Sequence, residues 1–124
     1  MKTCLVVDDL EIRHNGFKSI LGNKAKLLRA DNVTEATVQF HEMVFGEERP
    51  IDVIFLDHDI DSGFDKRDVI HFVNWLMDTD WAIDSLRKWG TTFFIHSHNP
   101  VGAGNMRKAL EDNGFTVKVK PFEV

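Results

Sequence analysis

The sequence is poor in the residues and segments that mark secreted and membrane proteins. Only one of its 124 residues is a cysteine, Cys4, so no internal disulfide can form and we expect a reducing, cytoplasmic setting. No apolar run approaches the roughly 20 residues of a membrane span, and no secretory signal opens the chain. Linker-like stretches rich in proline, glycine or serine are also missing. We therefore predict one cytoplasmic domain over residues 1–124, without membrane association.

Positive charge is also in short supply. The chain has 15 lysines and arginines against 20 aspartates and glutamates, which gives a formal net charge of -5 at pH 7. A protein that binds extended nucleic acid needs a basic surface to neutralise phosphates. The composition therefore excludes an extended nucleic-acid surface, but it is compatible with binding a single phosphate at a local site.

Short apolar runs alternate with helical patterns along the whole chain. The strands are predicted at residues 3–8, 26–31, 52–57, 91–97 and 115–119. Helices are predicted at 11–21, from Asn32 to Gly46, at 69–78, at 81–89, and around Met106 up to Asn113. This β-α order predicts a parallel sheet with right-handed crossovers and helices on both faces.

Ligands bind such sheets beyond the carboxyl ends of the strands. Polar residues gather at those positions in this sequence. They are Asp8 and Asp9 after the first strand, Asp57, His58 and Asp59 after the third, His96, Ser97, His98 and Asn99 after the fourth, and Lys120 after the fifth. We therefore expect the functional site at this edge of the sheet.

The aspartates at the strand ends predict a metal site. Carboxylates held within ~4–6 Å of one another repel, so they become protonated or bind a cation. Asp8, Asp9 and Asp57 offer oxygen ligands, which suit Mg²⁺ or Mn²⁺, whereas Zn²⁺ fits them less well. A turn that only caps the following helix is the alternative interpretation of Asp8 and Asp9.

The histidines suggest acid–base chemistry at the same edge. His96 and His98 are two residues apart, so in an extended strand both point to one face while Ser97 points to the other. They could act as general acid and base, bind a softer metal, or be structural. A one-residue slip would instead turn Ser97 toward the aspartates. We expect His58 as a further acid–base residue, with Asp59 and Asn99 orienting these histidines.

The segment after His98 predicts a phosphate-binding loop. Residues 99–105 contain two glycines and lead into a helix. Glycine lets backbone amides approach a ligand closely, and a helix N-terminus attracts anions. The expected phosphate-binding residues are Asn99, Gly102, Gly104 and Asn105. Lys120 adds a compact positive charge that could neutralise a phosphoryl oxygen.

Four segments resemble the receiver domains of two-component signalling. They are Leu5 to Arg13 (LVVDDLEIR), Asp52 to Asp57 (DVIFLD), Ser97, and Lys120-Pro121-Phe122. The resemblance implies a three-layer, flavodoxin-like receiver fold with a five-stranded parallel sheet in the order 2-1-3-4-5. It also implies that Asp8, Asp9 and Asp57 bind Mg²⁺, that Asp57 is the phosphorylatable position, and that Ser97 and Lys120 contact the phosphoryl group.

Other segments depart from ordinary receivers. Leu56 to Asp59 (LDHD) and Ile95 to Pro100 (IHSHNP), followed by Gly102 and Asn105, resemble the divergent cyclic-phosphate-processing receiver group. The resemblance to that group implies action on cyclic phosphate ends or related phosphoesters. In addition, we expect no terminal fifth helix after Phe122, and that helix is a usual output surface of signalling receivers.

Together these features predict a metal-dependent phosphoesterase that acts on a cyclic phosphate. Its partner would be a phosphorylated small molecule, a nucleotide or an RNA end. The predicted catalytic residues are His58, Asp59, His96, His98 and Lys120. One alternative is a stand-alone receiver that is phosphorylated at Asp57 and binds a partner. Another is a binder that leaves its nucleotide unchanged.

Overall fold

The strands form one parallel sheet. The computed structural model describes residues 1–61 and 65–120. The strands are β1 (Lys2–Val7), β2 (Ala25–Ala30), β3 (Val53–Leu56), β4 (Thr92–Ile95) and β5 (Val117–Val119). Their order in the sheet is β2-β1-β3-β4-β5, with every neighbouring pair parallel. The predicted order 2-1-3-4-5 is confirmed.

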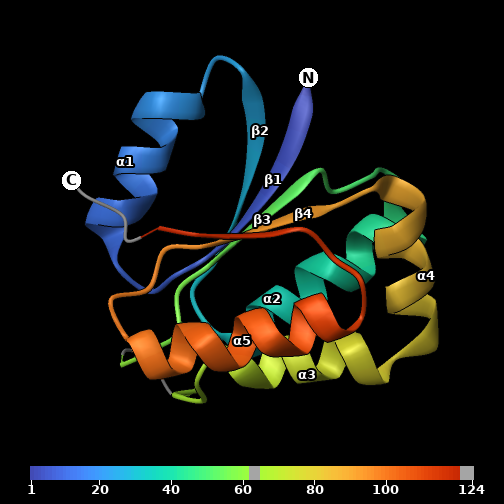
Figure 1. Ribbon diagram of the computed structural model, residues 1–124. Coiled ribbons are helices and arrows are strands. Elements are labelled where there is room, and N and C mark those ends of the chain that lie inside the picture. The colour runs from blue at the N-terminus through green and yellow to red at the C-terminus, as the bar shows by residue number, and fades with distance from the viewer. Residues whose placement is uncertain (62–64, 121–124) are drawn as a thin grey trace.

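The helices cover the two faces of the sheet unequally. They are α1 (Glu11–Leu21), α2 (Val33–His41), α3 (Ile70–Asp78), α4 (Asp80–Trp89) and α5 (Pro100–Asp112), and a π-helical turn, η1 (Glu42–Gly46), extends α2. In Figure 1, α1 lies on one face of the sheet, and α2, α3, α4 and α5 lie toward the other. The expectation that no helix follows Phe122 falls outside the described residues. Among the described helices, none combines the length and the apolar character needed to span a membrane.

Because side chains alternate along each strand, one set of strand residues points toward the side of the sheet covered by α2, α3, α4 and α5. Leu5, Ile54 and Phe93 are completely buried in the main core. The intervening residues point to the α1 side, where Phe17 of α1 packs on Phe55 with ring centroids 4.6 Å apart. Burial of such side chains contributes roughly 1.5–3 kcal/mol each. The core therefore holds the strands in one fixed register.

That register aligns the carboxyl ends of four strands. Val7 pairs with Leu56, Leu56 with Ile95, and Ile95 with Val119. Backbone hydrogen bonds continue one residue further, from the Asp57 amide to the Val7 carbonyl and from the His96 amide to the Leu56 carbonyl, both at 3.0 Å. The residues after these strands consequently meet at one rim of the sheet.

Candidate functional site

Three aspartates from two strand ends form a compact acidic cluster. One carboxylate oxygen each from Asp8, Asp9 and Asp57 lies within 4.8 Å of the others. Asp8 is completely buried and Asp57 is 6% exposed, so their charges are poorly screened by water. Three hard oxygen donors with this convergence fit Mg²⁺ or Mn²⁺, with water completing the shell. The predicted ligands are therefore brought together.

Asp8 is stabilised in its ionised form despite its burial. Its Oδ1 accepts a hydrogen bond from the Leu10 amide at 3.0 Å, and its Oδ2 lies 2.8 Å from Nε2 of His96. Burial alone would raise the pKa of Asp8, but the hydrogen bonds from His96 and Leu10, with the charge of Arg13, bring it below its ordinary value. The environment of Asp8 thus favours its ionised form.

At Asp57, burial and a neighbouring negative charge outweigh the stabilising hydrogen bonds. Its Oδ1 accepts the His58 amide at 2.8 Å, and its Oδ2 accepts a hydrogen bond from Arg13 at 2.7 Å. Burial and the neighbouring charge of Asp8 nevertheless raise the pKa of Asp57 above its ordinary value. An additional cation at this point would relieve that repulsion.

Asp9 connects the cluster to the loop after β3. It is only partly buried, and its Oδ2 accepts the backbone amide of Asp61 at 2.8 Å. This bond spans 52 residues of sequence, so it fixes the position of the Asp9 carboxylate relative to the third strand.

The two histidines after β4 lie in different environments, although the prediction treated them as a pair. His96 is 1% exposed and bonds to Asp8, whereas His98 is exposed. The prediction assumed an extended strand through His98, but β4 ends at Ile95, so strand alternation does not govern both side chains. Ser97 is buried, and its Oγ accepts the Asn99 amide at 3.0 Å. It is therefore His96, not Ser97, that contacts the acidic cluster.

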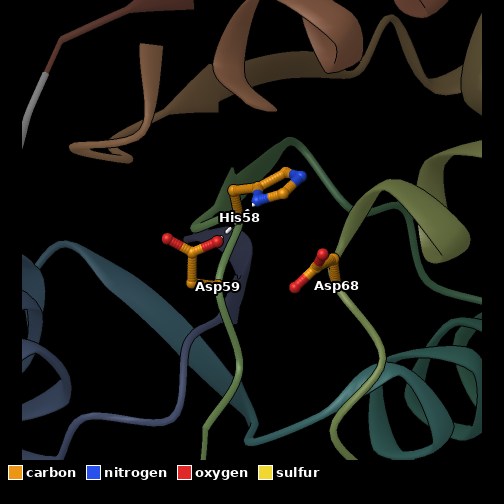
Figure 2. A group of neighbouring side chains, drawn as sticks. All are labelled: His58, Asp59 and Asp68. Atoms are coloured by element: carbon orange, nitrogen blue, oxygen red, sulfur yellow. Dashed lines mark hydrogen bonds and ion pairs between the residues drawn. The ribbon is translucent and has the colours of Figure 1, made fainter. Parts of the chain in front are cut away.

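A second group of polar side chains surrounds His58. Figure 2 shows His58 and Asp59 joined by a hydrogen bond, with Asp68 facing them from the segment before α3. Nδ1 of His58 lies 2.8 Å from Oδ1 of Asp59, and Nδ2 of Asn99 lies 3.3 Å from both atoms. The His58 bond lowers the pKa of Asp59, with further help from Asn99. An ionised Asp59 only accepts hydrogen bonds, so in the tautomer that carries its proton on Nδ1, His58 donates that proton to Asp59 and keeps a lone pair on Nε2.

The expected phosphate-binding loop is helical instead. Helix α5 begins at Pro100, so Gly102, Gly104 and Asn105 lie inside it. Asn99 is the N-cap, and its Oδ1 accepts the Gly102 amide at 2.9 Å. A proline at the first helical position is pre-organised for the helix and loses no hydrogen bond there. Pro100 was therefore a usable sequence signal that the helix begins before the glycines. The Gly102 amide consequently already has an acceptor.

Gly102 has a different role from the predicted one. A Cβ built on Gly102 would overlap the ring of His58, whereas one built on Gly104 would meet nothing within 4 Å. Gly102 therefore lets α5 approach the imidazole closely. Gly104, Ser97 and His98 instead line a pocket of about 390 Å³ beside β5. Lys120 follows β5 directly and is exposed.

Two residues of this region were missed by the sequence analysis. Arg13 bonds to both Asp8 and Asp57, and Asp68 offers an oxygen within 4.8 Å of ligand atoms of His58 and Asp59. The position of Arg13, in the first turn of the helix that follows the aspartate pair, was a usable signal. The sequence offers no such signal for Asp68, because no strand or helix pattern connects this residue to β3.

Comparison with known proteins connects this geometry to a family. The family model described as "Cyclic-phosphate processing Receiver domain" matches residues 3–112. A comparison with curated protein sequences finds no significant match.

Several solved structures with the same fold are described as response regulators or their receiver domains. A CheY-like receiver domain from Methanospirillum hungatei JF-1 superposes with a TM-score of 0.64 at 17% identity, over 99% of this chain and 84% of that one. The regulator TrrA from Thermotoga maritima, solved in complex with Mg²⁺ and BeF, gives 0.63 at 17% identity, over 99% and 90%. A Burkholderia pseudomallei response regulator with a phosphorylated aspartate and a calcium ion gives 0.63 at 17% identity, over 100% and 62%. At these identities the likeness establishes the fold alone.

Proposed function

The chain belongs to the cyclic-phosphate processing receiver domains, and from this we propose that it is a cytoplasmic, metal-dependent phosphoesterase that opens a cyclic phosphate or hydrolyses a related phosphoester. Its substrate would be a phosphorylated small molecule, a nucleotide or an RNA end. The site is the rim that carries the acidic cluster of Asp8, Asp9 and Asp57, with His58 next to Asp57 in the chain.

The His58–Asp59 pair is the observation that carries the proposal. A receiver that only transfers a phosphoryl group to its aspartate has no need of an oriented imidazole beside that aspartate. Ester hydrolysis does, because the attacking water loses a proton and the leaving alkoxide gains one. His58 directly follows Asp57 in the chain and is held by Asp59 at 2.8 Å. Asp59 and Asn99 are therefore positioning residues for a general base at Nε2 of His58.

The other residues supply charge and position. A divalent ion held by Asp8, Asp9 and Asp57 would polarise the phosphoryl group and make a bound water more acidic. Nε2 of the buried His96 lies 2.8 Å from Oδ2 of Asp8 and so helps to position that carboxylate. His98 and Lys120 are exposed near the same rim and are the candidates for contact with the departing group or the phosphoryl oxygens.

Hydrolysis assays test the proposal. We expect the wild type, with Mn²⁺ or Mg²⁺, to hydrolyse at least one member of a panel of 2′,3′-cyclic nucleotides, 3′,5′-cyclic nucleotides and 2′,3′-cyclic RNA ends. Removal of a general base costs roughly 10²–10⁴-fold in rate, so His58→Gln should lose about that much. His71→Gln, on the exposed side of α3, is the matched control and should retain full activity. Inactivity of the wild type on the entire panel, or full activity of His58→Gln, would contradict the proposal.

A second function is supported by the position of Asp57. It stands at the end of β3 beside two aspartates, and one structural relative is described with a phosphorylated aspartate. A receiver phosphorylated at Asp57 that binds a partner is therefore the alternative. Acetyl phosphate followed by intact-protein mass spectrometry separates the two: a phosphoryl adduct that disappears in Asp57→Asn, without turnover of cyclic phosphates, supports the alternative.

A further inference from the structure

Arg13 lies inside the acidic cluster rather than on the surface. It belongs to the first turn of α1, and its side chain is 15% exposed. One guanidinium nitrogen, Nη1, lies 2.7 Å from Oδ2 of Asp57 and 3.3 Å from Oδ2 of Asp8. This single nitrogen therefore bridges the ends of β1 and β3.

Arg13 contacts the carboxylate oxygens that accept no hydrogen bond from a backbone amide. Oδ1 of Asp8 accepts the Leu10 amide, and Oδ1 of Asp57 accepts the His58 amide. Both contacts of Arg13 are to the Oδ2 atoms. An ion shared by the two residues would meet Arg13 at both of these oxygens, and at Oδ2 of Asp8 it would also meet Nε2 of His96, 2.8 Å away.

A guanidinium and a divalent ion destabilise each other when both lie against Asp8 and Asp57. Both are cations, and in a partly buried site charges a few ångström apart interact strongly. Mg²⁺ also demands regular oxygen geometry at roughly 2.0–2.1 Å, which a nitrogen donor 2.7 Å from the same oxygen obstructs. The arginine side chain is long and flexible and reaches solvent, so it is the partner that can leave.

We propose that Arg13 is an internal counter-ion that competes with the divalent ion for Asp8 and Asp57, and that it leaves these carboxylates when the metal binds. The inference rests on the proposed metal-dependent function and adds to it a regulation of the same site. Without metal, Arg13 stabilises the carboxylates. Metal binding then has to displace Arg13, which lowers the apparent affinity for the ion.

Calorimetric titration with Mn²⁺ tests the competition. Arg13→Gln should bind Mn²⁺ at least roughly tenfold more tightly than the wild type, a coupling of ordinary size between two sites. Arg29→Gln is the matched control, because it removes the same charge from an exposed arginine that pairs with Glu11 and Asp31. It should bind Mn²⁺ as the wild type does. Equal or weaker binding by Arg13→Gln would overturn the inference.

A measurement on the wild type covers the case in which Arg13→Gln does not fold. In a protein with ¹⁵N-labelled arginine, saturation with Mg²⁺ should move the Nε–H resonance of Arg13 toward that of a free side chain and leave Arg29 unchanged. An unmoved Arg13 resonance at saturation would overturn the inference while leaving the proposed function intact. If neither protein binds Mn²⁺ at all, the metal-dependent function fails together with the inference.

Discussion

Two neighbouring carboxylates of the rim have opposite pKa shifts, and hydrogen bonds at Asp8 and charge repulsion at Asp57 explain the difference. Asp8 receives donors from Leu10, His96 and Arg13, and these outweigh its burial and lower its pKa. Asp57 is buried too, but the charge of Asp8 adds to the effect of burial and raises its pKa. An added cation would therefore favour the ionised form of Asp57.

Asp65 provides a test of an ion pair outside the site. Its Oδ2 accepts the amide and the hydroxyl of Thr34 at the start of α2, and its Oδ1 accepts Nε of Arg67 at 3.0 Å. The bonds from Arg67 and Thr34 hold the pKa of Asp65 well below the ordinary value of about 4. Because the folded pKa is depressed, the stabilisation is complete above that ordinary value and is lost as the pH falls through the folded pKa.

We therefore predict that Asp65→Asn lowers the free energy of unfolding by about 1 kcal/mol near neutral pH, the usual cost of losing a helix-terminal acceptor. The difference from the wild type should shrink as the pH falls below about 4. Urea unfolding over a pH series measures this, with the exposed Asp84→Asn as control. A difference that stays constant or grows on acidification would refute the assignment.

At the rim, the sequence indicated which residues gather but not which atoms meet. Strand ends alone placed Asp8, Asp9 and Asp57 together, because parallel strands in one register end at one edge. The pattern could not separate His96 from His98, since the turn after Ile95 departs from strand geometry. Arg13 was missed because a side chain of its length can reach many partners, and only three-dimensional packing selects one.

The N-terminus of α5 shows how one helix boundary changes the interpretation of a motif. The glycines expected in a loop lie in the helix because Asn99 caps it and Pro100 opens it. The close approach of α5 to His58 then requires the missing side chain of Gly102. The two glycines consequently differ in their tolerance of alanine.

We predict that Gly102→Ala displaces the His58 ring and reduces hydrolysis by an order of magnitude or more, because the base moves relative to the cluster. Gly104→Ala is the matched control. It gains helix propensity without a clash, so its free energy of unfolding should rise by up to about 1 kcal/mol with activity retained. Hydrolysis rates and urea unfolding of both variants check this. Similar behaviour of the two variants would mean that His58 is not held by α5.

The architecture of the molecule was almost entirely predictable from the sequence. The alternation of buried runs with amphipathic segments implied the parallel sheet, and the strand order followed from the family resemblance. The unequal covering of the two sheet faces in Figure 1 was less visible, because sequence patterns show which side of a helix is apolar but not which face of the sheet it covers.

The proposed function requires that one divalent ion binds at the rim among Asp8, Asp9 and Asp57. Paramagnetic broadening of backbone amide resonances by substoichiometric Mn²⁺ tests it most directly. We predict that the amide signals of Asp9, Asp57 and His58 broaden first, and that Asp57→Asn abolishes this selectivity. Broadening that begins elsewhere, for example at the exposed Glu47 and Glu48, would contradict the claim.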